Sequence, residues 1–426
     1  MAAMANTQDQ SRTEHFMRAL RVTVAAISGA GTATLQARQL LITKTAEPYG
    51  EDAVVEATTG LATAYSLGSV IEFILSPLFG RLSDRFGRKP LVLFLMIGPA
   101  CMRTLCAVVN RPRARIRLLW LDFASARAIG IQPFMGMCGT MIGDVFPADA
   151  QPAARAQLSA AQALGSIIGN YLSGWWNARA GPQSTYLFTA AVPLLSLAFA
   201  SVCLRETNAN KKDYSAASNP KTLGSKSVFA LLLDPECCLL AAALGLYEFM
   251  NYPPMNSVSI LFMKERLKWG PLEAGRFASG HALAVFSGSL CAGRLIKVFG
   301  KQLYVSITNL LTALAFLSWG TANNSWRLVA SLLPLALGTG GNTVLFTRFV
   351  ERAVQLGWTR GEATGVMQAI GAVGRMAAPQ LFNRLWLRAA AQKGQVRALP
   401  LGSPMLAVSA IALLQEILYR CSLAFR

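Results

Sequence analysis

The sequence contains little charge for its length. Only 14% of its 426 residues are Asp, Glu, Lys or Arg, whereas 53% are apolar. A soluble domain usually carries about 25% charged residues, because its surface must be compatible with water. Apolar runs of roughly 20 residues recur along this chain instead, and such runs are typical of helices that cross a bilayer. The composition therefore excludes an ordinary soluble domain and predicts an all-α membrane protein.

The residue patterns that accompany catalysis and metal binding are also missing. The chain has 2 histidines without an H-E-x-x-H motif, and 8 cysteines without a C-x-x-C pair. Such spacing supports neither a zinc site nor a disulfide framework. The G-x-x-x-x-G-K-[ST] loop that holds ATP does not occur. We therefore expect no enzyme activity, no metal, no cofactor and no ATP-driven step.

Positive charge is nevertheless in excess, with a formal net charge of +19 at pH 7. The cations lie between the apolar runs rather than along one face or in a tail, and no motif of a nucleic-acid module accompanies them. We therefore expect membrane lipid, and not nucleic acid, as the partner of this charge. Asp9 and Glu14 precede any apolar run, so no cleavable signal peptide is expected.

Twelve apolar segments can be marked, and the first is the weakest because it is short and rich in small residues. They lie at about 18–37, 59–80, 89–109, 118–145, 156–177, 184–204, 237–262, 272–293, 302–321, 327–347, 362–386 and 402–422. A polar, basic stretch at 205–227 separates the first six segments from the last six. We predict an N-terminal segment 1–17, a six-helix bundle 18–204, a linker 205–227 and a second six-helix bundle 228–426. Glycines within 165–174 and 365–379 are placed so that helices can approach closely.

A short charged motif occurs once in each half. The stretch "GRLSDRFGRKP" at 80–90 is matched by "GRLIKVFGK" at 293–301, and each copy follows the second segment of its half. The chain is therefore an internal duplication, which is a transporter architecture with its site near the bilayer midplane. We expect Gly80 and Gly87 to permit a tight turn, and we assign the residues of both copies to a gating loop. The residues concerned are Gly80, Asp84, Arg85, Gly87, Arg88, Lys89, Gly293, Arg294 and Gly300.

The first copy resembles the loop motif G-x-L-x-D-R-x-G-R-K of the major facilitator superfamily. Three further stretches are similar to that family: "GDVFPADAQPAARAQ" at 143–157, "CLRET" at 203–207 and "LKWGPLEAG" at 267–275. Within the family, the spacing looks nearest to drug/proton antiporters of the tetracycline-exporter type. The resemblance implies twelve transmembrane helices in two pseudo-symmetric halves. One departure is Asn170, which stands where these antiporters carry a proline in span five.

The resemblance also implies an orientation, with the motif at 80–90 and both termini in the cytoplasm. The basic stretch "NRPRARIR" at 110–117 would then face outward, against the usual bias of positive charge. In the family, the acidic residue of the motif contacts the start of span eleven, near Gly361 here. Asp84 is therefore expected to act as a conformational latch, or else is a solvated charge of the turn.

Ionisable side chains inside the spans are the candidates for function, because a charge near the bilayer centre costs about 3 kcal/mol on insertion scales. Glu72 either faces a cavity or pairs with Arg127 or Arg375. Arg127 also resembles the arginine of the family's fourth span. His281 is either a proton carrier or a hydrogen-bonded structural group. The full candidate set for the solute and proton pathway is Glu72, Arg127, Tyr247, Glu248, Asn251, Tyr252, His281, Asn342, Gln368 and Arg375.

These observations together predict a secondary transporter that moves a small organic solute by alternating access, with protons as the coupling ion. We expect it to act as a monomer in a membrane that the sequence does not identify. Two other interpretations remain open at this point: an uncoupled facilitator, and a non-transporting receptor or assembly protein with the same fold.

Overall fold

The structure is a computed structural model that describes residues 2–147, 151–208, 231–251, 257–338, 340–358, 360–392 and 400–425. Within these ranges every regular element is a helix, so the all-α prediction is confirmed. The chain divides into two compact units. Unit 1 comprises Met1–Ala64 and Ile71–Pro220, and unit 2 comprises Tyr65–Val70 and Lys221–Arg426.

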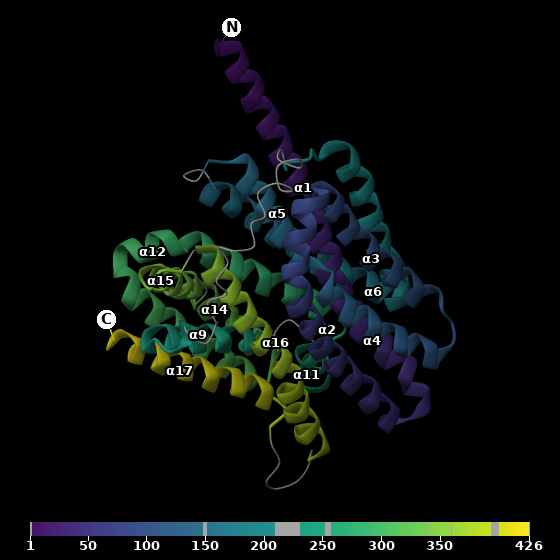
Figure 1. The fold of residues 1–426 in the computed structure, drawn as a ribbon. Helices are drawn as coiled ribbons and strands as arrows, with labels where there is room; N and C mark the ends of the chain where they lie inside the picture. Colours follow the sequence, from purple (N-terminus) through teal and green to yellow (C-terminus); the bar gives the residue numbers. More distant parts are fainter. Residues whose placement is uncertain are drawn as a thin grey trace. The chain divides into compact units, whose positions relative to one another are not determined.

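Unit 1 is a helical bundle in which α1 and α3 both pack along α6, and α3 also packs against α4 (Figure 1). Its elements are α1 (Ala2–Ala46), the 3-10 helix η1 (Glu47–Tyr49), α2 (Glu51–Phe86), α3 (Arg88–Val108), α4 (Pro112–Ala128), α5 (Ile131–Val145) and α6 (Gln151–Cys203). Helix α1 extends beyond both ends of the predicted first span, 18–37. Helix α1 runs unbroken to Ala46, and Arg38, which marked the predicted end of the span, is buried inside the bundle.

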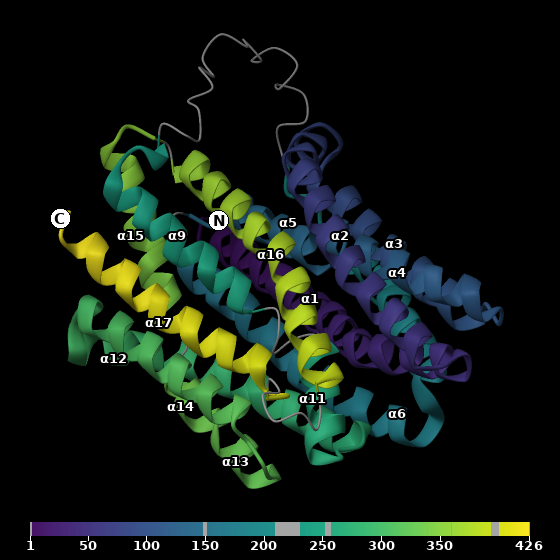
Figure 2. The same ribbon diagram turned by 90° about the horizontal axis from the view of Figure 1, so that it is seen from below.

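Unit 2 is a second bundle, in which α17 packs along α9 and α12 while α9 also packs along α16 (Figure 2). Its elements are α9 (Pro235–Met250), α11 (Ser257–Leu267), α12 (Pro271–Gly320), α13 (Ser325–Ala330), α14 (Leu332–Gly338), α15 (Gly341–Gln355), α16 (Arg360–Ala391) and α17 (Ser403–Leu423).

Two helices are too long for a single crossing of a membrane. Helix α6 has 53 residues and α12 has 50, whereas one span takes about 20. Each is broken once, at Gly181 (φ 82°, ψ 168°) and at Gly300 (φ 76°, ψ 158°). Each therefore supplies two consecutive spans. In the described part of the chain, six helical segments are long and apolar enough to cross a membrane, and two of these six are the doubled ones.

The duplicated motif has the same backbone turn in both copies. Gly87 lies between α2 and α3 with φ 107° and ψ 159°, and Gly300 breaks α12 with nearly the same ψ of 158°. A positive φ is strained for any residue with a Cβ, which explains a glycine at both positions. The prediction that Gly80 contributes to the turn was wrong. Gly80 lies inside α2 and Gly293 inside α12, so neither contributes to a turn.

Small residues bring helices into backbone contact in both units. A Cβ on Gly165 would lie 2.0 Å from the carbonyl oxygen of Ala25, and one on Gly169 would lie 2.2 Å from that of Gly29. These glycines are four residues apart on α6, as are their partners on α1, so the two helices meet along one line. The predicted close approach at 165–174 is confirmed. It allows side chains on neighbouring helices to meet deep inside the bundle.

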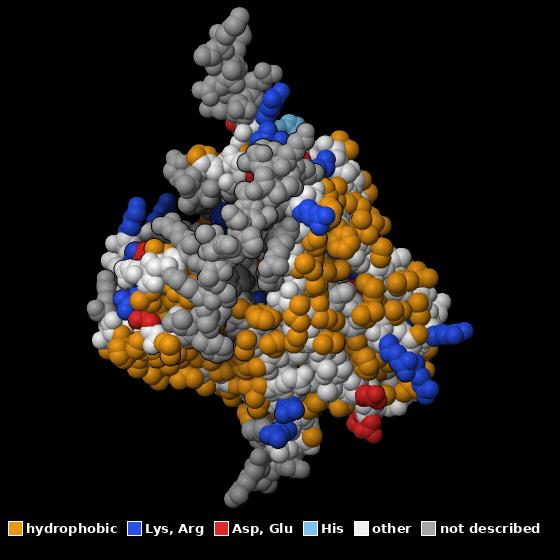
Figure 3. All heavy atoms as spheres, viewed as in Figure 1, with side chains coloured by type: hydrophobic (Ala, Val, Ile, Leu, Met, Phe, Trp, Pro, Cys, Tyr) orange, Lys and Arg blue, Asp and Glu red, His pale blue; other side chains and the backbone are white. Residues whose placement is uncertain are grey.

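Large apolar side chains are exposed on the outside of the helices. On α6, for example, Leu195 is 71% exposed and Val202 is 83% exposed. Figure 3 shows broad apolar areas over α2 and α3, with basic side chains at their margins. Contiguous apolar surface of this extent marks contact with something other than water, and for helices of this length that is the bilayer.

Candidate functional site

A carboxylate and a guanidinium meet inside unit 1. Arg127 on α4 donates through Nη2 to Glu72 Oε2 on α2 at 3.0 Å, and the two side chains are only 12% and 7% exposed. The structure therefore pairs Glu72 with Arg127, one of the two partners that the sequence suggested. A buried ion pair gains stability only if its charges stay matched, because losing one partner leaves the other uncompensated.

Unit 2 contains an ion pair of the same kind. Arg375 on α16 donates through Nη1 to Glu248 Oε2 on α9 at 2.7 Å. Glycines make room for it: a Cβ on Gly374 would lie 2.7 Å from the carbonyl oxygen of Gly245, and one on Gly371 would lie 3.1 Å from Cγ of Glu248. The close approach of α9 and α16, predicted from the glycines at 365–379, thus positions the pair.

Neutral polar groups from three helices lie in the same unit as this pair. The Tyr247 hydroxyl lies near the side chains of Asn251 and Asn342. Gln415 on α17 donates through Nε2 to Asn342 Oδ1 at 3.1 Å. Four of the predicted residues, Tyr247, Glu248, Asn251 and Asn342, are thus placed on α9, at its C-cap and on α15. Gln415 was missed, although it interrupts an apolar run.

Glu416, the neighbour of Gln415, is a second residue that sequence reasoning missed. Its carboxylate is buried in the middle of the twelfth span, where it accepts from Asn309 Nδ2 at 2.9 Å and from Arg420 Nε at 2.7 Å. A charged residue within an otherwise apolar run could have identified Glu416 from the sequence. Arg420 is one turn away on the same helix, so the Glu416–Arg420 ion pair does not link α17 to another span.

The remaining pathway candidates are not joined to these groups. His281 is buried on α12, where its ring meets Trp319 nearly edge-on with the centroids 6.0 Å apart. The choice between the two interpretations of His281, a proton carrier and a hydrogen-bonded structural group, stays a prediction. Tyr252 and the side chain of Gln368 lie outside the described parts of the chain.

A larger buried cluster in unit 1 was not anticipated. Asp122 on α4 is fully buried, and its Oδ2 accepts from Arg38 Nη2 at 2.7 Å and from the Tyr186 hydroxyl at 3.1 Å. Arg103 on α3 is also buried and donates to the carbonyl oxygen of Thr189 at 2.9 Å. The cluster ties α1, α4 and α6 together through charge. Arg103 lies within the predicted span 89–109, where its charge was visible in the sequence.

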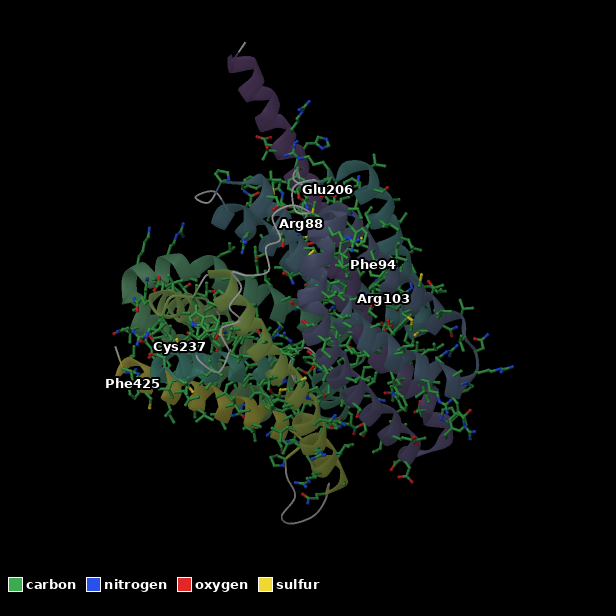
Figure 4. All side chains as sticks on the ribbon, in the orientation of Figure 1. Arg88, Phe94, Arg103, Glu206, Cys237 and Phe425 are labelled. Carbon is green, nitrogen blue, oxygen red and sulfur yellow. The ribbon has the colours of Figure 1, made fainter. Side chains whose placement is uncertain are left out.

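The first copy of the duplicated motif forms a polar network within unit 1. The backbone N–H of Arg88 donates to Glu206 Oε1 at 2.8 Å, and its Nε donates to Asp144 Oδ2 at 3.2 Å. Figure 4 shows Arg88 and Glu206 close together at the same end of the unit. Lys89 Nζ donates to the carbonyl oxygen of Ser201 at 2.7 Å. These contacts tie the start of α3 to the ends of α5 and α6.

Other charges of the motif are not part of that network. Arg85 is exposed, with its guanidinium 5.4 Å from the centre of the Phe86 ring. In the second copy Arg294 is exposed. The side chain of Asp84, for which a latch contact near Gly361 was predicted, lies outside the part of the structure that is described. The two copies thus share a backbone turn, while the polar contacts differ.

Unit 2 has its own charged cluster at the start of α9. Asp234 caps this helix by accepting from the backbone N–H of Cys237 at 3.0 Å. Arg352 Nη2 donates to Asp234 Oδ1 at 2.7 Å, and Arg348 Nε donates to Glu236 Oε1 at 2.7 Å. The hydrogen bond from Arg352 holds the pKa of Asp234 below its usual value, although partial burial opposes the shift. Among the described residues, no group of three His, Cys, Asp or Glu side chains is placed to hold a metal.

Comparison with known proteins identifies the family. Residues 27–379 match the model of the Major Facilitator Superfamily. The class H tetracycline resistance protein of Pasteurella multocida is 23% identical over 328 residues, covering 76% of this chain and 79% of that protein. The class B protein of Escherichia coli is 24% identical over 326 residues, covering 75% and 78%.

Solved structures agree on the fold. A D-xylose–proton symporter matches with a TM-score of 0.74 and 14% identity, over 95% of this chain and 97% of the other. The human organic anion transporter MFSD10 (TETRAN) matches with a TM-score of 0.62 and 18% identity, over 95% and 99%. The prediction of a twelve-helix fold nearest to tetracycline exporters is confirmed. The chain belongs to the Major Facilitator Superfamily and is a multi-pass membrane protein that acts as a secondary active transporter, not an enzyme.

Proposed function

We propose that this transporter couples the movement of a polar organic solute to protons through its two acid–arginine pairs inside the bundles. One observation supports this above all: each unit pairs one carboxylate with an arginine of a different span, Glu72 with Arg127 and Glu248 with Arg375. Protonation of the carboxylate removes the charge that holds its arginine. The loss of this ionic contact favours a rearrangement of the spans.

The proton gradient supplies enough free energy for such a cycle. One elementary charge crossing 100 mV is worth about 2.3 kcal/mol, and a difference of one pH unit adds about 1.4 kcal/mol. Together these support a solute gradient of several hundredfold, since about 1.4 kcal/mol corresponds to a factor of ten. A carboxylate near the bilayer centre can load a proton on one side and release it on the other.

The solute would contact the neutral polar groups of unit 2. The Tyr247 hydroxyl and the amides of Asn251, Asn342 and Gln415 offer both donors and acceptors beside the Glu248 pair. A site of this chemistry suits an uncharged or zwitterionic molecule with hydroxyl or amide groups. The tetracycline resistance proteins among the relatives are consistent with that class.

The direct test uses purified protein in proteoliposomes under an imposed pH gradient. Tryptophan fluorescence first selects a bound solute from tetracyclines, sugars, nucleosides and organic anions. We expect Glu72→Gln and Glu248→Gln to abolish pH-driven transport of that solute. Glu416→Gln is the matched control, because it removes a buried carboxylate from a span without breaking an ionic contact between spans, and it should keep transport pH-dependent.

Each alternative outcome has a defined meaning. Unchanged pH-driven transport in both Glu72→Gln and Glu248→Gln would contradict coupling through the pairs. A transport rate of the wild-type protein that does not depend on the pH gradient indicates an uncoupled facilitator. Solute binding without any flux indicates a receptor or assembly protein.

We further propose that the motif at 80–90 gates the cytoplasmic side and that the protein works as a monomer. The support for the gate is the anchoring of Arg88 and Lys89 to the ends of α5 and α6, which leaves the preceding turn at Gly87 as the point of movement.

In this proposal 205–227 is the cytoplasmic linker between bundles 18–204 and 228–426. An epitope inserted near residue 215 should be inaccessible from outside intact cells, and an accessible epitope would contradict this topology.

A further inference from the structure

The basic stretch at 110–117 is not used by the transport mechanism. Arg111 caps the start of α4, and Arg113 and Arg117 follow on the helix, all three exposed to solvent. No ion pair or hydrogen bond joins these three side chains to a residue that the structure describes. Between residues 110 and 121 the sequence contains no acidic residue. A concentrated positive charge therefore stands at this end of unit 1 without an ion-pair partner among the described residues.

A fourth arginine of the stretch has a different role. Arg115 is half-buried and donates through Nε to the carbonyl oxygen of Val109 at 2.7 Å and through Nη2 to Asn110 Oδ1 at 3.0 Å. It thereby closes the connection between α3 and α4. This contact fixes the first turn of α4, so that the exposed arginines are presented on a rigid helix.

The exposed row continues directly into apolar surface. Arg113, Arg117 and Leu121 are spaced four residues apart, so they lie on one face of α4, about 6 Å apart along its axis. Leu121 is 55% exposed, and Val108 at the end of the adjoining α3 is 62% exposed. The face thus passes from cationic to apolar over about two helical turns. This order of basic and then apolar side chains along the helix matches a lipid with an anionic headgroup and an acyl chain.

The neighbouring tryptophan indicates where the membrane boundary lies. Trp120 on α4 donates through Nε1 to the carbonyl oxygen of Ala57 on α2 at 2.9 Å. Tryptophan is enriched where hydrocarbon meets the headgroups, and Trp120 lies between the arginines and the apolar part of the same helix. The guanidinium groups of Arg113 and Arg117 therefore stand at headgroup level. The N-terminal end of the α4 dipole adds to the positive potential there.

We propose that the Arg113–Arg117 face of α4 is a binding site for an anionic phospholipid. The two guanidinium groups contact the lipid phosphate, Arg111 adds to the field, and Leu121 contacts the acyl chain. Arginine is suited to this role because its planar donors match phosphate oxygens. The bound lipid neutralises the outward-facing charge that would otherwise oppose the predicted orientation. The inference does not rest on proton coupling.

The test compares phosphatidylglycerol with phosphatidylcholine, using the full chain in nanodiscs that contain both lipids. Native mass spectrometry measures which lipid stays bound after release from the nanodisc. We expect phosphatidylglycerol to be preferred, and Arg113→Gln/Arg117→Gln to reduce that preference about fivefold for each arginine removed. Arg113→Lys/Arg117→Lys should retain most of it, because the charge is kept.

The matched control is Arg179→Gln/Arg327→Gln. Both side chains are exposed and lie on other helices, Arg179 on α6 and Arg327 on α13, and their removal changes the net charge by the same amount. This control should keep the preference of the wild type. Salt titration of the wild-type protein is an independent measure, because the preference should weaken as salt rises. An unchanged preference in Arg113→Gln/Arg117→Gln, an equal loss in the control, or a preference that high salt does not affect would each overturn the proposal.

Discussion

Arg38 on α1 and Asp122 on α4 form the most deeply buried ion pair that the described residues contain. Both Nε and Nη2 of Arg38 donate to the same oxygen of Asp122, at 3.1 and 2.7 Å, and the two side chains are 3% and 0% exposed. The Tyr186 hydroxyl donates to that oxygen as well. A charge held so far from water is stabilised only by its partner, so this contact controls the stability of unit 1.

Neutralising Asp122 should destabilise the protein strongly. Asp122→Asn leaves the buried guanidinium of Arg38 uncompensated, and the free energy of unfolding should fall by about 3–5 kcal/mol. Thermal unfolding in detergent measures the loss. Glu14→Gln is the control, because the Glu14–Arg18 pair is exposed by 69% and 70% and such pairs contribute little. Equal melting temperatures for Asp122→Asn and the wild type would show that the pair is not structural.

The two pairs proposed for coupling should differ in how much stability they control. Glu72 is 7% exposed, whereas Glu248 is 35% exposed and therefore partly hydrated. Removing Glu72 should cost about 3–5 kcal/mol and removing Glu248 clearly less, because water can then solvate Arg375 in part. The double variant Glu72→Gln/Arg127→Gln should recover stability relative to Glu72→Gln while still lacking pH-driven transport. Recovery of transport in the double variant would assign the pair a structural role only.

A single methyl group at the α1–α6 contact should disturb unit 1. In Gly169→Ala the new Cβ would lie 2.2 Å from the carbonyl oxygen of Gly29, which is backbone and cannot turn aside. We expect a loss of about 1–3 kcal/mol, as for other overpacked sites. Gly139→Ala is the control, since nothing lies within 4 Å of a Cβ there and alanine favours the helix by up to about 1 kcal/mol. The melting temperature should therefore fall in Gly169→Ala and rise in Gly139→Ala.

The Asp234–Arg352 contact predicts a pH dependence in acid. Because Arg352 lowers the pKa of Asp234 in the folded state, the contact stabilises the protein fully above the unfolded pKa of about 3.9. That contribution is lost as the pH falls through the lower, folded pKa. The melting temperatures of the wild type and Asp234→Asn should therefore differ at neutral pH and converge in acid. A difference that stays constant down to the lowest accessible pH would contradict this assignment.

The fold was predictable from the sequence because a span needs a long apolar run, and such runs are visible without any partner. The duplicated motif was equally accessible, and Gly87 and Gly300 confirm it by sharing one backbone conformation. The extent of α1 was not predictable from hydropathy. Arg38 looks like the end of a span until Asp122 is seen to neutralise it.

The candidate site was predictable only in part, for a related reason. Charges in the middle of a span stand out, and Glu72, Arg127, Glu248 and Arg375 were found in this way. Their pairing depends on how far each helix turns and where glycines let helices approach, which periodicity does not reveal. Asp122 was missed because it lies near the predicted start of its span, where a charge ordinarily reaches water.

The one-residue joints at Gly87, Gly181 and Gly300 have a consequence for how the folded chain can be cut. A protease nicks exposed, flexible loop tips, yet at each of these joints helix resumes at the next residue. Limited proteolysis of the intact protein should therefore leave the two spans on either side of each joint in one fragment. Cleavage at any of the three would report that the adjoining helices had already begun to unravel.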